Sequence, residues 1–132
     1  MVQYYKKFNC DLAHNLIIER IGDIQKLPVA YKDRLNILKS AGKEYNVYMG
    51  EINVQNLSPD VIKQVIGKNG CYFIQTTINS DLDFIWHNRS SNTIEFWGPY
   101  DNIQYAINII NSRIKNKSIS SSIEEEFKNY EM

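Results

Sequence analysis

Residues 62–70 read Ile-Lys-Gln-Val-Ile-Gly-Lys-Asn-Gly, and the two glycines of this stretch lie three positions apart. Ser58 and Pro59 precede it as an N-cap and a first helical residue, so the pattern predicts a helix over residues 61–66. An apolar-periodic stretch directly after the second glycine predicts another helix. The glycines therefore form a sharp turn between two helices, where the second helix presents unpaired amide groups to a ligand.

Strand patterns lie on both sides of this pair of helices. Residues 84–87 and 93–97 are β-prone and are joined by a polar connection, which predicts two adjacent strands. Residues 45–54 alternate as in a strand, and Gly50 within them indicates a bulge or bend. A long helix is expected after the last strand, with these residues on one face: Ile103, Ala106, Ile107, Ile110 and Ile114.

The remaining residues divide into an extension and a tail. Residues 1–44 predict two helices, one that Asp11 caps and one that begins at Pro28, and so form a helical N-terminal extension ahead of a domain over residues 45–115. Residues 116–132 form a tail that is either a short helix or disordered. Short helices cannot bury an apolar stripe alone, so the extension is expected to pack on the sheet or on a second copy of the chain. The stripe residues are Leu12, Leu16, Leu35 and Leu38.

Two stretches resemble a known family. Residues 62–73 resemble the V-G-x-I-I-G-x-x-G-x-x-I signature of the KH family. The later run Ile94-x-Phe96-x-Gly98, then Ile103-x-x-Ala106-x-x-x-Ile110, is similar to that family's ending. The resemblance covers residues 45–115 and implies an α+β protein with a type I KH fold: β-α-α-β-β-α, a three-stranded antiparallel sheet with three helices.

The resemblance also implies a binding site for single-stranded RNA or DNA. In the KH family the glycine loop holds the nucleic-acid backbone while bases lie on an apolar groove. Lys63 stands where the family has a small glycine, and it either crowds the groove or offers a phosphate contact. The residues implied are Gly67, Lys68, Asn69 and Gly70 in the loop and Ile66, Phe73 and Phe84 in the groove; the candidate site also includes Trp86 as a stacking platform, Arg89 as a phosphate contact, and Lys63 with both of its readings.

Plainer readings of the same residues stay open. Two glycines three apart also occur in a tight helical corner, and buried aromatic residues belong to a core more often than to a binding surface. A KH-fold module that binds a protein partner, or a homo-oligomeric scaffold joined through the N-terminal helices, is therefore the alternative function.

Several classes of function are excluded by the sequence. Fifteen basic residues balance fifteen acidic ones, so charge alone does not indicate a duplex-binding protein. The sequence contains no nucleophile motif, no phosphate-binding loop and no paired acids of the kind that indicate an enzyme. No catalytic residue is therefore expected. His14, His87, Cys10 and Cys71 lack metal-ligand spacing, so neither a metal nor a cofactor is expected. Without a signal peptide or a membrane-length apolar run, a cytoplasmic protein is expected, with the nucleus left open.

Overall fold

The computed structural model describes residues 5–22, 29–42 and 45–130, with side chains up to residue 117. The helices and strands follow in this order: β1 (Lys6–Asn9), α1 (Cys10–Ile21), α2 (Val29–Ala41), β2 (Asn46–Asn53), α3 (Pro59–Ile66), the single 3-10 turn η2 (Lys68–Gly70), α4 (Cys71–Asn79), β3 (Phe84–Asn88), β4 (Thr93–Gly98) and α5 (Tyr100–Tyr130). From β2 onward this is the order that the sequence predicts, so an α+β protein is confirmed.

Within the described residues the sheet has four antiparallel strands in the order β1-β2-β4-β3. The expected three-stranded sheet is therefore too small, because the N-terminal extension contributes a strand as well as two helices. β1 pairs with β2 from Lys6 opposite Met49 to Asn9 opposite Asn46. β1 has only four residues, and its partner strand lies about forty positions later in the sequence. So short a strand has no clear alternation of apolar and polar residues, and the sequence pattern therefore does not reveal it.

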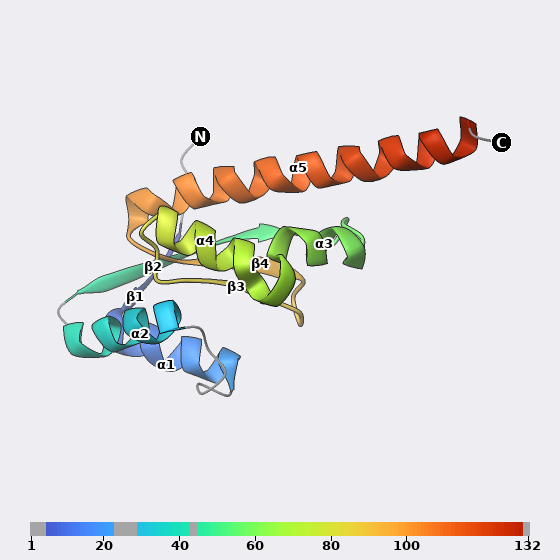
Figure 1. Cartoon of the computed structure of the whole chain (residues 1–132). Helices are drawn as coiled ribbons and strands as arrows, with labels where there is room; N and C mark the ends of the chain where they lie inside the picture. The colour runs from blue at the N-terminus through green and yellow to red at the C-terminus, as the bar shows by residue number, and fades with distance from the viewer. Residues whose placement is uncertain (1–4, 23–28, 43–44, 131–132) are drawn as a thin grey trace.

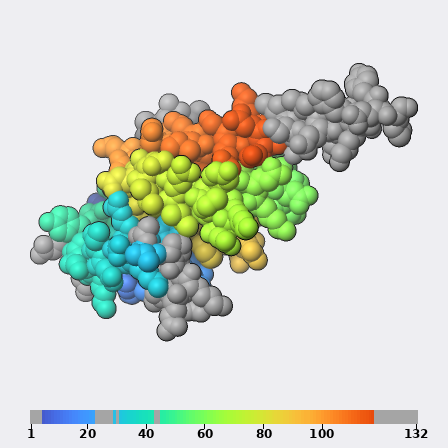
Figure 2. All heavy atoms as spheres, in the orientation of Figure 1, coloured from blue at the N-terminus to red at the C-terminus, as the bar shows by residue number. Residues whose placement is uncertain are grey.

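Helices cover both faces of the sheet, as Figure 1 shows: α3, α4 and α5 lie on one side and α1 and α2 on the other. Figure 2 shows α2, in cyan, next to α4, in yellow-green, on one face of the molecule. Each face has its own core. The core under α3, α4 and α5, named the α5 layer here, contains Val54, Val61, Ile62, Val65, Phe73, Leu82, Ile85, Ile94, Phe96, Ile103, Ala106, Ile107 and Ile110. The core under α1 and α2, named the α1–α2 layer, contains Cys10, Ala13, Ile17, Tyr31, Leu35, Leu38, Val47, Met49, Phe84 and Trp97.

The extension therefore packs on the sheet, as its apolar stripes predict. Leu35 and Leu38 of α2 are buried, whereas Leu12 of α1 is 46% exposed because α1 turns Ala13 and Ile17 toward the sheet. α1 also begins earlier than expected. The side chain of Asn9, and not that of Asp11, caps the helix by accepting a hydrogen bond from the amide of Leu12 at 2.8 Å.

Gly50 is not the site of a bulge. Its strand keeps an unbroken register with β4, in which Gly50 lies opposite Phe96 and Glu51 opposite Glu95. A Cβ atom at Gly50 would lie 2.7 Å from the ring of Tyr5 and 3.0 Å from the Cγ2 atom of Ile103. Glycine therefore serves close packing against the strand rather than a bend in it.

α5 is one continuous helix from Tyr100 to Tyr130. The helix passes residue 115, after which a tail that is either a short helix or disordered was expected, without a break. The side chains of residues 118–130 lie outside the described part of the chain.

Candidate nucleic-acid interface

The glycine loop has the backbone that its sequence predicts. Gly67 and Gly70 have positive φ angles of 84° and 75°, and Asn69 between them has a φ of 56°. A Cβ atom at Gly67 would also lie 2.4 Å from the ring of Tyr72. Both positions therefore favour glycine for conformational reasons, and Gly67 for steric ones as well. The expected N-cap of the helix before the loop is confirmed, since Ser58 Oγ accepts a hydrogen bond from the amide of Val61 at 3.3 Å.

The loop leads directly into the N-terminus of α4. Gly70 is the N-cap residue, and no side chain caps this helix. The first amide groups of α4 consequently have no side-chain acceptor, and the positive end of the helix dipole lies at the loop. The side chains of Lys68 and Asn69 are exposed at its tip. This arrangement suits an anionic group such as a phosphate.

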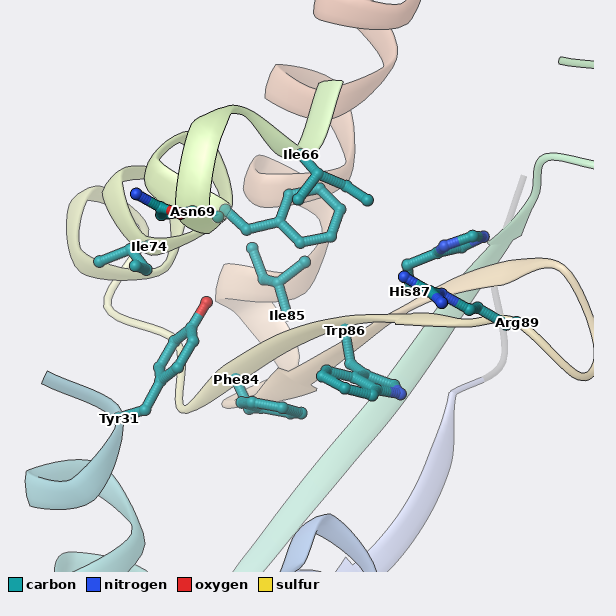
Figure 3. Close-up of a pocket in the computed structure, with 11 residues that line it drawn as sticks. Tyr31, Ile66, Asn69, Ile74, Phe84, Ile85, Trp86, His87 and Arg89 are labelled. Carbon is teal, nitrogen blue, oxygen red and sulfur yellow. The ribbon is translucent and has the colours of Figure 1, made fainter. Parts of the chain in front are cut away.

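A cavity of about 450 Å³ lies beside the loop, within the usual size range of ligand sites. Figure 3 shows its walls: the end of α3, the loop and α4 on one side, and β3 with Tyr31 of α2 on the other. Three of the predicted site residues, Lys63, Gly67 and Lys68, do not line it. The lining residues are Tyr31, Ile66, Asn69, Gly70, Phe73, Ile74, Phe84, Ile85, Trp86, His87 and Arg89.

The aromatic residues predicted for the groove have unequal exposure. Phe73 is 5% exposed and Phe84 only 1%, so both are core residues that reach the cavity with an edge. Trp86 is half-buried and lies on the same side of β3 as Phe84, as strand alternation predicts. The two rings stack with centroids 5.7 Å apart. Phe84 therefore supports Trp86 and offers little surface of its own to a base.

Tyr31 is the lining residue that sequence reasoning missed most clearly. Its ring meets Phe84 edge-on at 5.0 Å, and its hydroxyl lies 3.2 Å from Thr77 Oγ1. Burial raises the pKa of Tyr31 to about 12, against the opposing effect of hydrogen bonds with Thr77 and the backbone of Ile85. The phenol is therefore neutral and closes one end of the cavity. No local signal in the sequence links α2 to the groove.

Three other lining residues also escaped prediction. Ile74 and Ile85 each follow a predicted site residue, and sequence alone did not show how far the cavity extends along α4 and β3. His87 is held by a 2.9 Å hydrogen bond between its Nε2 atom and Asn92 Oδ1.

The charges near the loop are distributed favourably for an anion. Lys63, Lys68 and Arg89 are exposed, and within the side chains that the structure describes none of them forms an ion pair. Residues 45–115 carry six acidic side chains against five basic ones, but guanidinium groups of the extension pair with three of the six. These three are Glu95, bound by Arg20 at 2.7 Å, and Asp81 and Asp83, which face Arg34. The extension therefore offsets negative charge on the sheet.

Asp83 is the most perturbed of these carboxyl groups. Burial raises its pKa to about 6, the Arg34 guanidinium 4.0 Å away lowers it, and Asp81 raises it further. Burial, with a smaller contribution from Asp83, likewise raises the pKa of the Cys10 thiol. Cys10 begins α1 and Asp83 directly precedes β3, and neither residue lines the cavity.

Other kinds of site find no support in the described residues. No group of three or more histidine, cysteine or acidic side chains in the described part of the chain is placed to hold a metal ion. Among the described helices, none has the length and apolarity to span a membrane. No protein-family model, curated protein or solved structure matches the chain.

Proposed function

We propose that this protein binds single-stranded RNA or DNA, with residues 45–115 forming a type I KH domain. The observation that carries the proposal is the apolar cavity between the glycine loop and β3, beside which the N-terminus of α4 has no side-chain cap and Lys68 of the loop is exposed. The element order from β2 and the strand order β2-β4-β3 support the same fold. β3 is an edge strand within the described residues, so one row of its backbone groups faces away from β4 and toward the ligand.

Each predicted residue has a role in this proposal. A backbone phosphate binds at the loop, where Lys68 and the amides of α4 stabilise its charge. Bases lie over Ile66 and against Trp86, whose half-buried ring offers a stacking surface. Lys63 on α3 and Arg89 beyond β3 neutralise neighbouring phosphates from either side of the cavity. Phe73 and Phe84 hold the floor of the site in place.

The variant Lys68→Asp with Asn69→Asp tests the loop directly. Two carboxylates at the tip repel the phosphate, so affinity for single-stranded homopolymers falls on the order of tenfold or more in a filter-binding assay. The thermal unfolding midpoint stays unchanged, because both side chains are exposed. Lys115→Asp with Asn116→Asp is the matched control, since these residues repeat the Lys-Asn pair at exposed positions on α5. Equal affinity of the two double variants and the parent chain would exclude the loop as a phosphate site.

The salt dependence of binding tests which part of the chain contacts phosphates. Each phosphate contact with a single strand contributes a log–log slope of about −0.7, and few cations face the cavity, so we expect a slope of about −1 to −3. The measurement is affinity for a short single strand over a tenfold range of salt. A slope steeper than about −5 would assign binding to residues 1–44, which carry eight basic and five acidic residues.

A protein-binding scaffold is the second candidate function. The observation that favours it is the exposure of large apolar side chains outside the cavity, among them Val29 at 70% and Ile37 at 57%, both on α2. A scaffold of this kind shows no retention of homopolymers at low salt and sediments as an oligomer. Retention of homopolymers by a monomer would support the nucleic-acid proposal instead.

A further inference from the structure

A second cavity, of about 440 Å³, lies at the other end of β3. It is formed by Glu19 and Arg20 at the end of α1 and by residues 86–90 of β3 and the turn after it. Trp86, His87 and Arg89 line this cavity and also the one beside the glycine loop. The two cavities therefore lie next to each other and share these three residues of β3 and the turn after it.

The floor of the second cavity carries little net charge. Arg20 donates two hydrogen bonds to the buried Glu95 carboxylate, at 2.7 and 3.2 Å, and its guanidinium lies 5.6 Å from the centre of the Trp97 ring. Arg20 and Glu95 thus neutralise each other. Arg89 and Glu19 are exposed at the mouth, one of each sign. A ligand that fits here presents a neutral, polar group to the floor and an anionic group to Arg89.

The turn after β3 supplies polar groups of the kind that recognise a base edge. The Asn88 side-chain oxygen accepts hydrogen bonds from the amides of Ser90 and Ser91, at 3.1 and 3.4 Å. These two bonds use the oxygen of the Asn88 amide and not its NH₂ group, and both Asn88 and Ser90 line the cavity. Trp86, half-buried and stacked on Phe84, provides an apolar surface at the entrance.

From these shared residues we infer that the nucleic-acid groove extends past Trp86 into the second cavity, which holds the next base of the same strand. The inference rests on the proposed function and adds the length of the strand that the protein contacts. A base stacked at Trp86 leaves its phosphate near Arg89, the cation common to both cavities, and the following base faces Asn88 and Ser90. α1 thus forms part of the binding surface, and the extension has a role beyond covering the sheet.

The test compares short and long strands. Random-sequence pools of four and of seven nucleotides, as RNA and as DNA, are titrated against the parent chain and against Glu19→Lys. A stacked base contributes about 1–3 kcal/mol, so the parent chain binds the seven-nucleotide pool at least about fivefold more tightly. Glu19→Lys replaces a repelling charge at the mouth of the second cavity, and it improves affinity for the long pool about two- to fivefold while leaving the short pool unchanged.

Asp33→Lys is the matched control, because it makes the same change of charge at an exposed position of α2 that lines neither cavity. It changes the affinity for both pools by the same factor. Ser90→Glu adds a negative charge to the second cavity, so its effect on affinity is opposite to that of Glu19→Lys: it weakens binding of the long pool alone.

The outcomes separate the two proposals. Tight binding of both pools, with Glu19→Lys acting on both alike, would overturn the extended groove and leave the proposed function standing. A parent chain that binds neither pool would overturn the proposed function itself.

Discussion

The two cores on either side of the sheet are built differently. The buried apolar residues of the α5 layer all lie between Val54 and Ile110. The α1–α2 layer joins residues 10–49 to Phe84 and Trp97, and the buried Glu95 carboxylate, which Arg20 binds, contacts the Trp97 ring nitrogen beside it. One of its ion pairs joins residues 75 positions apart in the sequence. The first layer assembles from neighbouring elements, whereas the second requires that distant charges find their partners during folding.

Deletion of residues 1–44 removes the helices of the α1–α2 layer and is expected to have the largest effect on stability. The deletion removes β1, α1 and α2 and exposes Val47, Met49, Phe84 and Trp97, each of which gains roughly 1.5–3 kcal/mol by burial. The sum is comparable to the whole stability of a small domain, so we expect loss of the cooperative thermal transition or aggregation in sedimentation. If the α5 layer suffices alone, the truncated chain stays soluble, monomeric and as stable as the parent.

Arg20→Met tests the ion pair within the α1–α2 layer. It leaves the Glu95 carboxylate, which is 2% exposed, without its guanidinium partner, and we expect a loss of about 3 kcal/mol in the free energy of unfolding. Chemical denaturation measures this loss. The double variant Arg20→Met with Glu95→Met is the control, because apolar replacement of both partners restores most of the stability. If Arg20→Met alone lowers the free energy of unfolding by less than about 1 kcal/mol, this ion pair contributes no more than an ordinary surface pair.

Asp83→Asn gives the smallest effect, and it depends on pH. The Asp83 carboxyl has a pKa of about 6 in the folded chain against 3.8 unfolded, so the folded state binds the proton more tightly. Its contribution to stability is present below about pH 4 and is lost as pH rises through 6. Relative to the variant, the parent chain therefore loses about 2–3 kcal/mol between pH 4 and pH 7, measured by denaturation at each pH.

Asp33→Asn, which removes an exposed carboxylate from the same helix as Arg34, is the control for this series. A constant difference in stability between the parent chain and Asp83→Asn across pH 4–7 would mean that Asp83 titrates alike in the folded and unfolded chain.

Local patterns predicted what local physics determines. The N-cap at Ser58, the glycine loop and the alternation of the strands identified each element from β2 to β4, because caps, turns and side-chain periodicity depend on a few adjacent residues. Alternation also placed Phe84 and Trp86 on one side of β3. It could not show that Phe84 is covered, since the covering side chain, Tyr31, comes from a helix more than fifty positions earlier.

The remaining errors share this cause. β1 is a four-residue strand, and two helices separate it in the sequence from its partner β2. Glycine is required at position 50 because Tyr5 and Ile103 pack against it, and neither residue belongs to its own strand. The upper wall of the candidate site, from Ile66 to Phe73, follows from the sequence. On the opposite wall the sequence identified Phe84, Trp86 and Arg89 but not Tyr31, because Tyr31 reaches the groove only through packing of the extension.

Formation of the α1–α2 layer has a consequence for synthesis on the ribosome. The two helices of the extension are translated first, but their partners Phe84 and Trp97 follow only about fifty residues after α2. Because translation adds about 5–20 residues per second, the apolar stripes of these helices stay exposed for roughly 3–10 s before the surface that buries them is synthesised. The nascent chain therefore exposes these apolar stripes until β4 has been synthesised, long enough for a chaperone to bind them.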